Sequence, residues 1–155
     1  MRCGGFRLRR PGRAGWPTNK LAVYQMTEPQ CSAVTVVEEF WRLMATNDFS
    51  SVTAVLSEEF VLEWPQSNER ICGGERFAAM NSEYPANGPW RFSVHRIVGN
   101  ATEAVSEVGV TDGVQQAKAI SFFTVAAGKI TRVVEYWPEP YSAAANRKHL
   151  VEPIQ

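Results

Sequence analysis

The sequence predicts an α+β fold in which helices come first and a curved antiparallel sheet follows. Three observations favour it. An apolar stripe at helical spacing opens the domain near residue 32, a second helical segment ends before Pro85, and four strand-like runs with short turns fill residues 90–137. Short turns join antiparallel neighbours. A strongly twisted sheet can then curl around the first helix into a cone with a pocket inside.

The first half of the domain is expected to contain a helix, a second helix, a strand and a third helix, in that order. The first helix is the best defined, because Val34, Val37, Trp41 and Met44 recur on one face and the pair Asn47-Asp48 ends it. Proline closes both the strand and the third helix. The predicted elements are a helix over 32–48, a short helix over 49–60, a strand over 60–65, a loop over 66–74 and a helix over 74–85.

Alternation of side chains along the last two strands places polar and aromatic residues together. Glu135 and Trp137 share one face of the last strand, and Ser121 and Phe123 share one face of the strand before it. Both faces of the sheet carry apolar residues, so we expect both to be covered. The four predicted strands span 90–98, 103–110, 114–125 and 129–137.

Charge and cysteine content exclude several classes of protein. Residues 26–155 hold ten basic and sixteen acidic residues, a net charge of −6, which disfavours nucleic-acid binding. No apolar run reaches the roughly 18 residues of a membrane span. Three widely spaced cysteines without a CxxC pair or a His cluster predict free thiols, no metal site and a cytoplasmic protein.

The first 29 residues differ in composition from the rest. Residues 1–25 contain six basic residues, no acidic residue and several Gly and Pro. They lack the apolar core of a secretory signal, and Pro and Gly would interrupt the amphipathic helix of a transit peptide. We interpret residues 1–29 as a disordered basic extension, with Met26 as the natural start. A basic arm for an acidic partner is the alternative.

Two stretches resemble a known family. "FWRLMATNDFSSVTAVLSEEFVLEWP" at the front and "FFTVAAGKITRVVEYWPEP" at the back are similar to the SnoaL-like branch of the nuclear-transport-factor-2-like superfamily. The resemblance implies a cystatin-like cone over residues 30–142. The C-terminal tail, 143–155, is expected from the sequence to be irregular or briefly helical and to fold back on the sheet. The superfamily includes ketosteroid isomerase, polyketide cyclases, epoxide-hydrolase-like enzymes and non-catalytic modules, so its fold alone does not define an activity.

The resemblance also implies site residues. An acidic residue near the end of the last strand points into the pocket of cyclase-like and hydrolase-like members, and Glu135 matches it. Glu63 falls where the hydrolases place an inward amide, and His95 could orient a carboxylate or shuttle a proton. We therefore expect Glu135, with Glu63 or His95, to perform acid/base chemistry. The expected substrate-binding residues are Trp41, Glu107, Ser121, Phe123 and Trp137.

Two departures from the family limit the choice of reaction. The inward Arg-x-Asp pair of the hydrolases would fall on Glu107 and Gly109, and the first helix offers Phe40 and Trp41 where ketosteroid isomerase has a tyrosine. The resemblance then implies a cofactor-independent isomerase, cyclase or hydratase/hydrolase-like enzyme that acts on a small apolar carbonyl compound. It also implies a homodimer through the outer face of the sheet.

Each expectation has a structural alternative. Glu135 could pair with an arginine across the sheet, Glu63 could lie at the sheet rim, and Glu107 could be a solvated strand residue. His95 could be an ordinary strand histidine, and the tryptophans could serve as core. The corresponding functional alternative is a non-catalytic ligand-binding or dimerisation module on the same cone.

Overall fold

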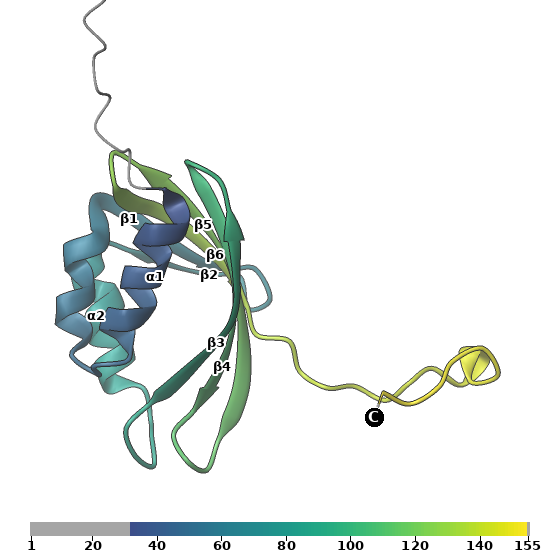
Figure 1. Cartoon of the computed structure of the whole chain (residues 1–155). Helices are drawn as coiled ribbons and strands as arrows, with labels where there is room; N and C mark the ends of the chain where they lie inside the picture. The colour runs from purple at the N-terminus through teal and green to yellow at the C-terminus, as the bar shows by residue number, and fades with distance from the viewer. Residues whose placement is uncertain (1–31, 155) are drawn as a thin grey trace, which may run out of the picture.

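The computed structural model describes residues 32–154, and the predictions for residues 1–29, including a start at Met26, lie outside this range. Two helices lie on one side of a strongly curved sheet (Figure 1). The elements are α1 (Ala33–Met44), a 3₁₀ helix (Phe49–Val55), β1 (Leu56–Trp64), β2 (Glu69–Cys72), α2 (Gly74–Glu83), β3 (Arg91–Gly99), β4 (Glu103–Thr111), β5 (Gln116–Ala126), β6 (Lys129–Tyr136) and a short 3₁₀ turn (Ala145–Arg147).

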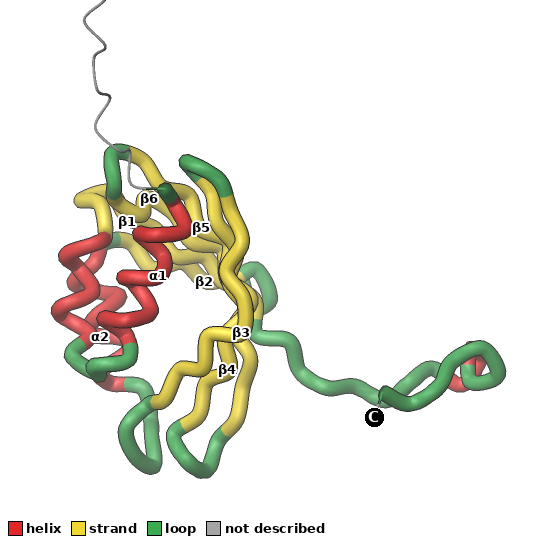
Figure 2. The backbone as a smooth tube through the Cα atoms, viewed as in Figure 1, coloured by secondary structure: helices red, strands yellow, loops and turns green. Residues whose placement is uncertain are grey.

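The predicted α+β cone is confirmed, and the sheet differs from the prediction in two respects. It has six strands in the order β2-β1-β6-β5-β4-β3. The stretch expected as a loop over 66–74 contains β2, which forms a hairpin with β1. β1 also runs parallel to β6, so the sheet is mixed rather than wholly antiparallel. Figure 2 shows the strands as one continuous curved layer.

The concave face of the sheet and α1 form the core. The side chain of Ser32 caps α1 by accepting a hydrogen bond from the Thr35 amide. The buried face of α1 then presents Phe40 and Trp41, whose rings pack edge-on against Phe123 of β5 at centroid distances of 5.4 and 6.4 Å. The predicted apolar stripe of the first helix is therefore the face that packs against the sheet.

Asp112 fixes the wide end of the cone. One carboxylate oxygen accepts hydrogen bonds from the backbone and side-chain amides of Asn87 at 2.8 and 2.9 Å and from the side chain of Gln115 at 2.8 Å. The other accepts from the backbone amides of Val114 and Gln115 at 2.9 and 2.7 Å. These five donors hold the pKa of Asp112 far below its usual range. They join the loop before β3 to the β4–β5 turn.

The convex face of the sheet carries an apolar patch without a cover among the described residues. Phe122 is 47% exposed and Val98 is 55% exposed, and the rings of Phe122 and Tyr136 pack at 6.1 Å. The strand registers place all its members on this outer face. The convex patch consists of Val98, Val105, Ile120, Phe122, Val134 and Tyr136.

The C-terminal arm, residues 138–154, extends away from the domain on the side opposite the helices (Figure 1). Every residue in it is exposed, and its backbone hydrogen bonds lie within the arm itself. The prediction that the tail folds back on the sheet is therefore wrong. Pro138 and Pro140 follow directly after β6, and prolines favour an extended chain that cannot continue the strand pairing.

Candidate functional site

The carboxyl group of Glu135 is buried on the concave face, near the end of β6. Its Oε2 accepts hydrogen bonds from the indole Nε1 of Trp64 at 2.9 Å and of Trp137 at 3.1 Å. Its Oε1 accepts from the hydroxyl of Ser121 at 2.8 Å. The residue is only 9% exposed, so these neutral donors replace water as its main partners.

Burial raises the pKa of Glu135 above its usual range. The hydrogen bonds from Trp64, Ser121 and Trp137 oppose this effect, because each stabilises the charged form, but desolvation is larger. Among residues 32–154 no Lys, Arg or His forms an ion pair with this carboxyl. The predicted alternative, pairing with an arginine across the sheet, is not what the structure has.

A row of small polar side chains links Glu135 to α1. Ser121 on β5 faces Glu135 on one side and Ser106 on β4 on the other, as directly opposed strand partners. Both serines are fully buried. The indole of Trp41 donates to the hydroxyl of Ser106 at 3.1 Å. The concave face therefore carries two buried hydrogen-bonded pairs side by side, Trp41 with Ser106 and Ser121 with Glu135.

Glu63 and Glu107 lie on the opposite, convex face and do not join Glu135. The side chain of Glu63 is bound by Arg70 at 2.8 Å and by Nε of Arg132 at 3.1 Å, and these hydrogen bonds lower its pKa. Glu107 pairs with Lys118 at 2.6 Å, which lowers its pKa in the same way. The structure thus brings together four predicted site residues on the concave side besides Glu135: Trp41, Ser121, Phe123 and Trp137.

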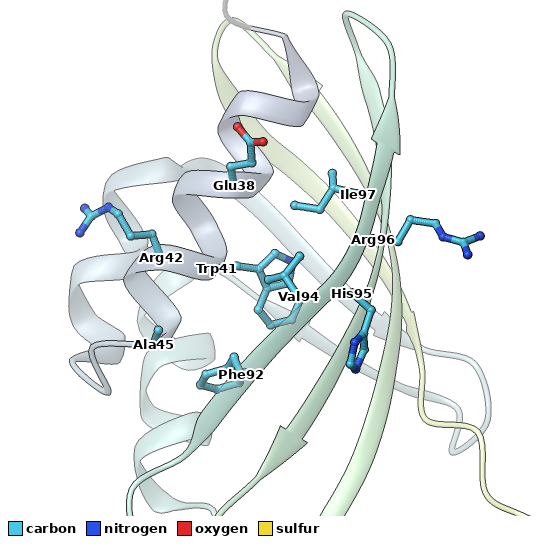
Figure 3. Close-up of a pocket in the computed structure, with 9 residues that line it drawn as sticks. All are labelled: Glu38, Trp41, Arg42, Ala45, Phe92, Val94, His95, Arg96 and Ile97. Carbon is cyan, nitrogen blue, oxygen red and sulfur yellow. The ribbon is translucent and has the colours of Figure 1, made fainter.

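His95 also lies outside the cone, because a bulge interrupts β3. Val94 pairs with Val108 and Arg96 pairs with Glu107, so His95 is the extra residue between them. Its imidazole lies over the convex surface of Gly109, where an added Cβ would come within 2.9 Å of Nε2. Figure 3 shows His95 and Arg96 turned to the side of β3 away from α1. The expected placement of His95 near the carboxyl is therefore not observed.

Two residues of the site, Trp64 and Ser106, were not predicted. The sequence contains a signal for both. Phe60, Leu62 and Trp64 alternate along β1, which leaves Glu63 on the polar face. In β4 the two glutamates share a face, so Ser106 lies on the other. At this register the inward pair on β4 is Ser106 and Val108, and the Arg-x-Asp pair of the hydrolases is absent here as well.

A groove of about 480 Å³ runs between α1 and β3 (Figure 3). Trp41 forms its floor and packs against the ring of Phe92 at 5.8 Å, and Glu38 and Arg42 stand on the α1 side. The groove is lined by Glu38, Trp41, Arg42, Ala45, Phe92, Val94, His95, Arg96 and Ile97. Glu135 is not among these residues, so the groove and the buried carboxyl are two different sites, and the pair of Trp41 and Ser106 lies between them.

Metal binding and membrane insertion find no support in the part of the chain that the structure describes. Residues 32–154 contain no group of three or more His, Cys, Asp and Glu side chains positioned to bind a metal ion. Within the same range, no helix combines the length and apolar composition required to span a bilayer.

Comparisons with known proteins agree with the fold. The family model described as "SnoaL-like domain" matches residues 37–133, well over half of the chain. The fold, the helix-covered concave face and this match show that the chain belongs to the SnoaL-like domain family. No curated protein matches at a significant level.

Three solved structures illustrate the similarity. A putative ketosteroid isomerase from Kribbella flavida is 30% identical, with a TM-score of 0.72 over 81% of this chain and 90% of that one. An NTF2-like protein of unknown function from Burkholderia xenovorans is 25% identical, with a TM-score of 0.64 over 77% and 93%. An epoxide hydrolase from M. tuberculosis, described as LEH-like, is 25% identical, with a TM-score of 0.56 over 68% and 81%.

Proposed function

We propose that this protein is a cofactor-independent enzyme that uses Glu135 as acid and base on a small apolar molecule carrying a carbonyl group. The observation that supports this most directly is the buried carboxyl held by three neutral donors and no cation. A carboxyl whose pKa is raised by burial exchanges protons more readily near neutral pH. The similarity to a putative ketosteroid isomerase is consistent with this chemistry.

The two carboxyl oxygens have different roles in this proposal. An indole N–H can only donate, so Oε2, which accepts from Trp64 and Trp137, stays an acceptor in both protonation states. The hydroxyl of Ser121 can donate or accept. When Glu135 is protonated, the proton therefore resides on Oε1, and Ser121 reverses its hydrogen bond to accept it. Oε1 is the oxygen that we assign to proton transfer.

The corresponding reaction is a proton shift next to a carbonyl. Oε1 removes a proton from the adjacent carbon, and the electron pair of the broken C–H bond forms a C=C bond while the carbonyl becomes an enolate. The protonated Oε1 then returns the proton to the same carbon, or to a more distant carbon of a conjugated system. Trp64 and Trp137 are partly exposed, and they lie beside the carboxyl as apolar surfaces for such a substrate.

The test is proton exchange in D₂O, followed by ¹H NMR over a panel of apolar cyclic ketones. The wild type is expected to accelerate exchange, and Glu135→Gln to lose about 10²–10⁴-fold of that rate. Glu63→Gln is the matched control, since it makes the same change on the convex face and is expected to retain the rate. The ¹³C carboxyl titration of Glu135 provides a substrate-free check. A titration midpoint at or below the usual glutamate value would contradict the proposal.

A second candidate is a non-catalytic ligand-binding module. The groove between α1 and β3 favours it, because it is a concave surface with Trp41 and Phe92 in its lining and it does not contain Glu135. Tryptophan fluorescence distinguishes the two functions, since Trp41 forms the floor of the groove. A ligand of the groove would quench Trp41 and compete poorly with a ketone bound near Trp137. Trp41→Phe would remove that signal while leaving Glu135 in place.

Association of two copies through the convex patch is also part of this proposal. An apolar patch centred on Phe122 and Tyr136 is exposed in the isolated chain, and exposed apolar patches of this kind mark interaction surfaces. Phe122→Glu is expected to give a folded monomer in light scattering. A cytoplasmic location remains a proposal too, and cell fractionation with an antibody would test it.

A further inference from the structure

We propose that the C-terminal arm, residues 138–154, packs on a second copy of this chain and clamps two domains together. This inference rests on the proposed convex-face dimer and adds to it a role for a segment outside the domain. The arm makes no hydrogen bond with residues 32–136. Yet it exposes large apolar side chains: Tyr141 is 83% exposed, Leu150 76% and Ile154 fully. Covering such side chains with another surface lowers the free energy of the system.

The starting point of the arm directs it toward the partner. Tyr136 is the last residue of β6 and belongs to the convex patch, and the arm begins two residues later. Pro138 and Pro140 keep the first part of the arm extended. In Figure 1 the arm leaves on the convex side and moves away from its own sheet. If two convex patches face each other about a two-fold axis, each arm therefore passes onto the other copy.

The size of the combined surface fits a stable interface. The arm has 17 residues and the convex patch has six, so 23 residues are available on each side. Specific protein–protein interfaces use roughly 20–30 residues a side. The patch alone provides too few, and the arm supplies the difference.

Charge also favours a copy of this chain as the partner. Residues 32–137 contain thirteen acidic and eight basic residues, whereas the arm carries Arg147 and Lys148 in succession, next to His149, and has Glu139 and Glu152 as its two acidic residues. The arm as a whole has no net charge, but its basic segment at 147–149 and an acidic domain attract each other. Both features are present on every copy, so the exchange satisfies both members of a two-fold pair at once.

The first experiment measures dimerisation of the full chain by sedimentation equilibrium. The double variant Leu150→Ser/Val151→Ser is expected to raise the dimer dissociation constant at least about tenfold. Val114→Ser is the matched control, because Val114 is equally apolar, 74% exposed and lies on the β4–β5 turn outside the patch. It is expected to leave the constant unchanged. A full chain that stays monomeric at every concentration measured would overturn the convex-face dimer and the arm exchange together, whereas equal constants for all three proteins would overturn the arm exchange alone.

The second experiment identifies what the arm contacts. A benzophenone amino acid is placed at Leu150, and ¹⁴N- and ¹⁵N-labelled chains are mixed before illumination. The proposal predicts cross-linked peptides of mixed isotope label that join the arm to another copy. If all cross-linked peptides carry unmixed label, the arm contacts its own domain, and this result would contradict the proposal. The same probe at Ala79, an exposed position on α2, is expected to give no mixed cross-links.

Discussion

Two glutamates on neighbouring strands, Glu135 on β6 and Glu63 on β1, have opposite environments. Glu63 faces the convex side, where Arg70 and Arg132 bind its carboxylate and lower its pKa. Glu135 faces the concave side, where burial raises its pKa and all of its partners are neutral. The strands that carry them are hydrogen-bonded to each other. A change of sheet face therefore decides the chemistry of a carboxyl more than its position in the chain.

The two carboxyl groups also differ in how readily they exchange a proton. A carboxylate with two guanidinium partners is already satisfied in its charged form and has little tendency to accept a proton. A buried carboxyl with neutral donors lies closer to the balance between its two forms, which is the property that acid/base catalysis requires.

Replacing Glu135 by alanine is expected to have the largest effect on stability. It leaves two indole N–H groups and the hydroxyl of Ser121 without their acceptor in a buried site, at a cost of roughly 3 kcal/mol. Urea unfolding at pH 5 measures it. Glu63→Ala, the same change on the convex face, is expected to shift the midpoint only slightly, since its arginines stay in water. Equal losses of unfolding free energy in Glu135→Ala and Glu63→Ala would contradict the difference between the two environments.

Glu135 is expected to make the free energy of unfolding decrease as pH rises. Its pKa is raised on folding, so its contribution is fully present below the unfolded value near 4.5 and is lost as pH rises through the folded value. Glu135→Gln mimics the protonated form and removes this loss. The variant should therefore gain on the wild type as pH rises from about 4.5 to 7, by about 1.4 kcal/mol per unit of upward shift. A difference that is constant with pH would contradict the raised pKa.

Asp112 is expected to have the opposite effect on the pH dependence of stability. Its pKa is lowered by five hydrogen bonds, so its contribution is present above the unfolded value near 3.8 and is lost as pH falls toward the folded value. Asp112→Asn replaces one acceptor oxygen by a donor and is expected to lower the melting temperature at pH 7. The difference from the wild type should shrink toward pH 2. Thermal unfolding followed by circular dichroism measures both.

The smallest effect is expected at the convex ion pairs. Glu63→Gln removes the charge that binds Arg70 and Arg132 but keeps a hydrogen-bonding group in place. Exposed ion pairs contribute little and are screened by salt. The melting temperature should fall slightly at low ionic strength, and the difference should vanish in 1 M NaCl. A difference that survives high salt would show that Glu63 has a structural role beyond its charge.

The sequence predicted the fold and the centre of the site better than the site's outer members. The faces of β5 and β6 were predicted correctly because their alternation is regular, and this placed Ser121, Phe123 and Glu135 together. For β4 and β1 the family resemblance implies a register that is wrong by one residue, because it places Glu107 and Glu63 inside where the structure has Ser106 and Trp64. A shift of one residue transfers every side chain of a strand to the other face.

Three features could not have been predicted from the sequence alone. The bulge at His95 reverses the alternation of β3, and nothing in "SVHRIV" marks it. β2 consists of four mostly exposed residues whose strand conformation depends on pairing with β1. The parallel pairing of β1 with β6 depends on how the whole chain closes. Each of these is set by tertiary contacts, which outweigh local preference.

The parallel pairing of β1 with β6 has a consequence for the order of assembly. The hydrogen bond from Trp64 to Glu135 joins residues that are 71 positions apart, and closing so large a loop is slow and costs entropy. On the ribosome, β1 emerges long before its neighbour β6 exists, so one of its edges and its indole stay unpaired until the last strand has been made. A nascent chain that stops before Trp137 would therefore expose a hydrophobic edge, and chaperones would be expected to bind it there.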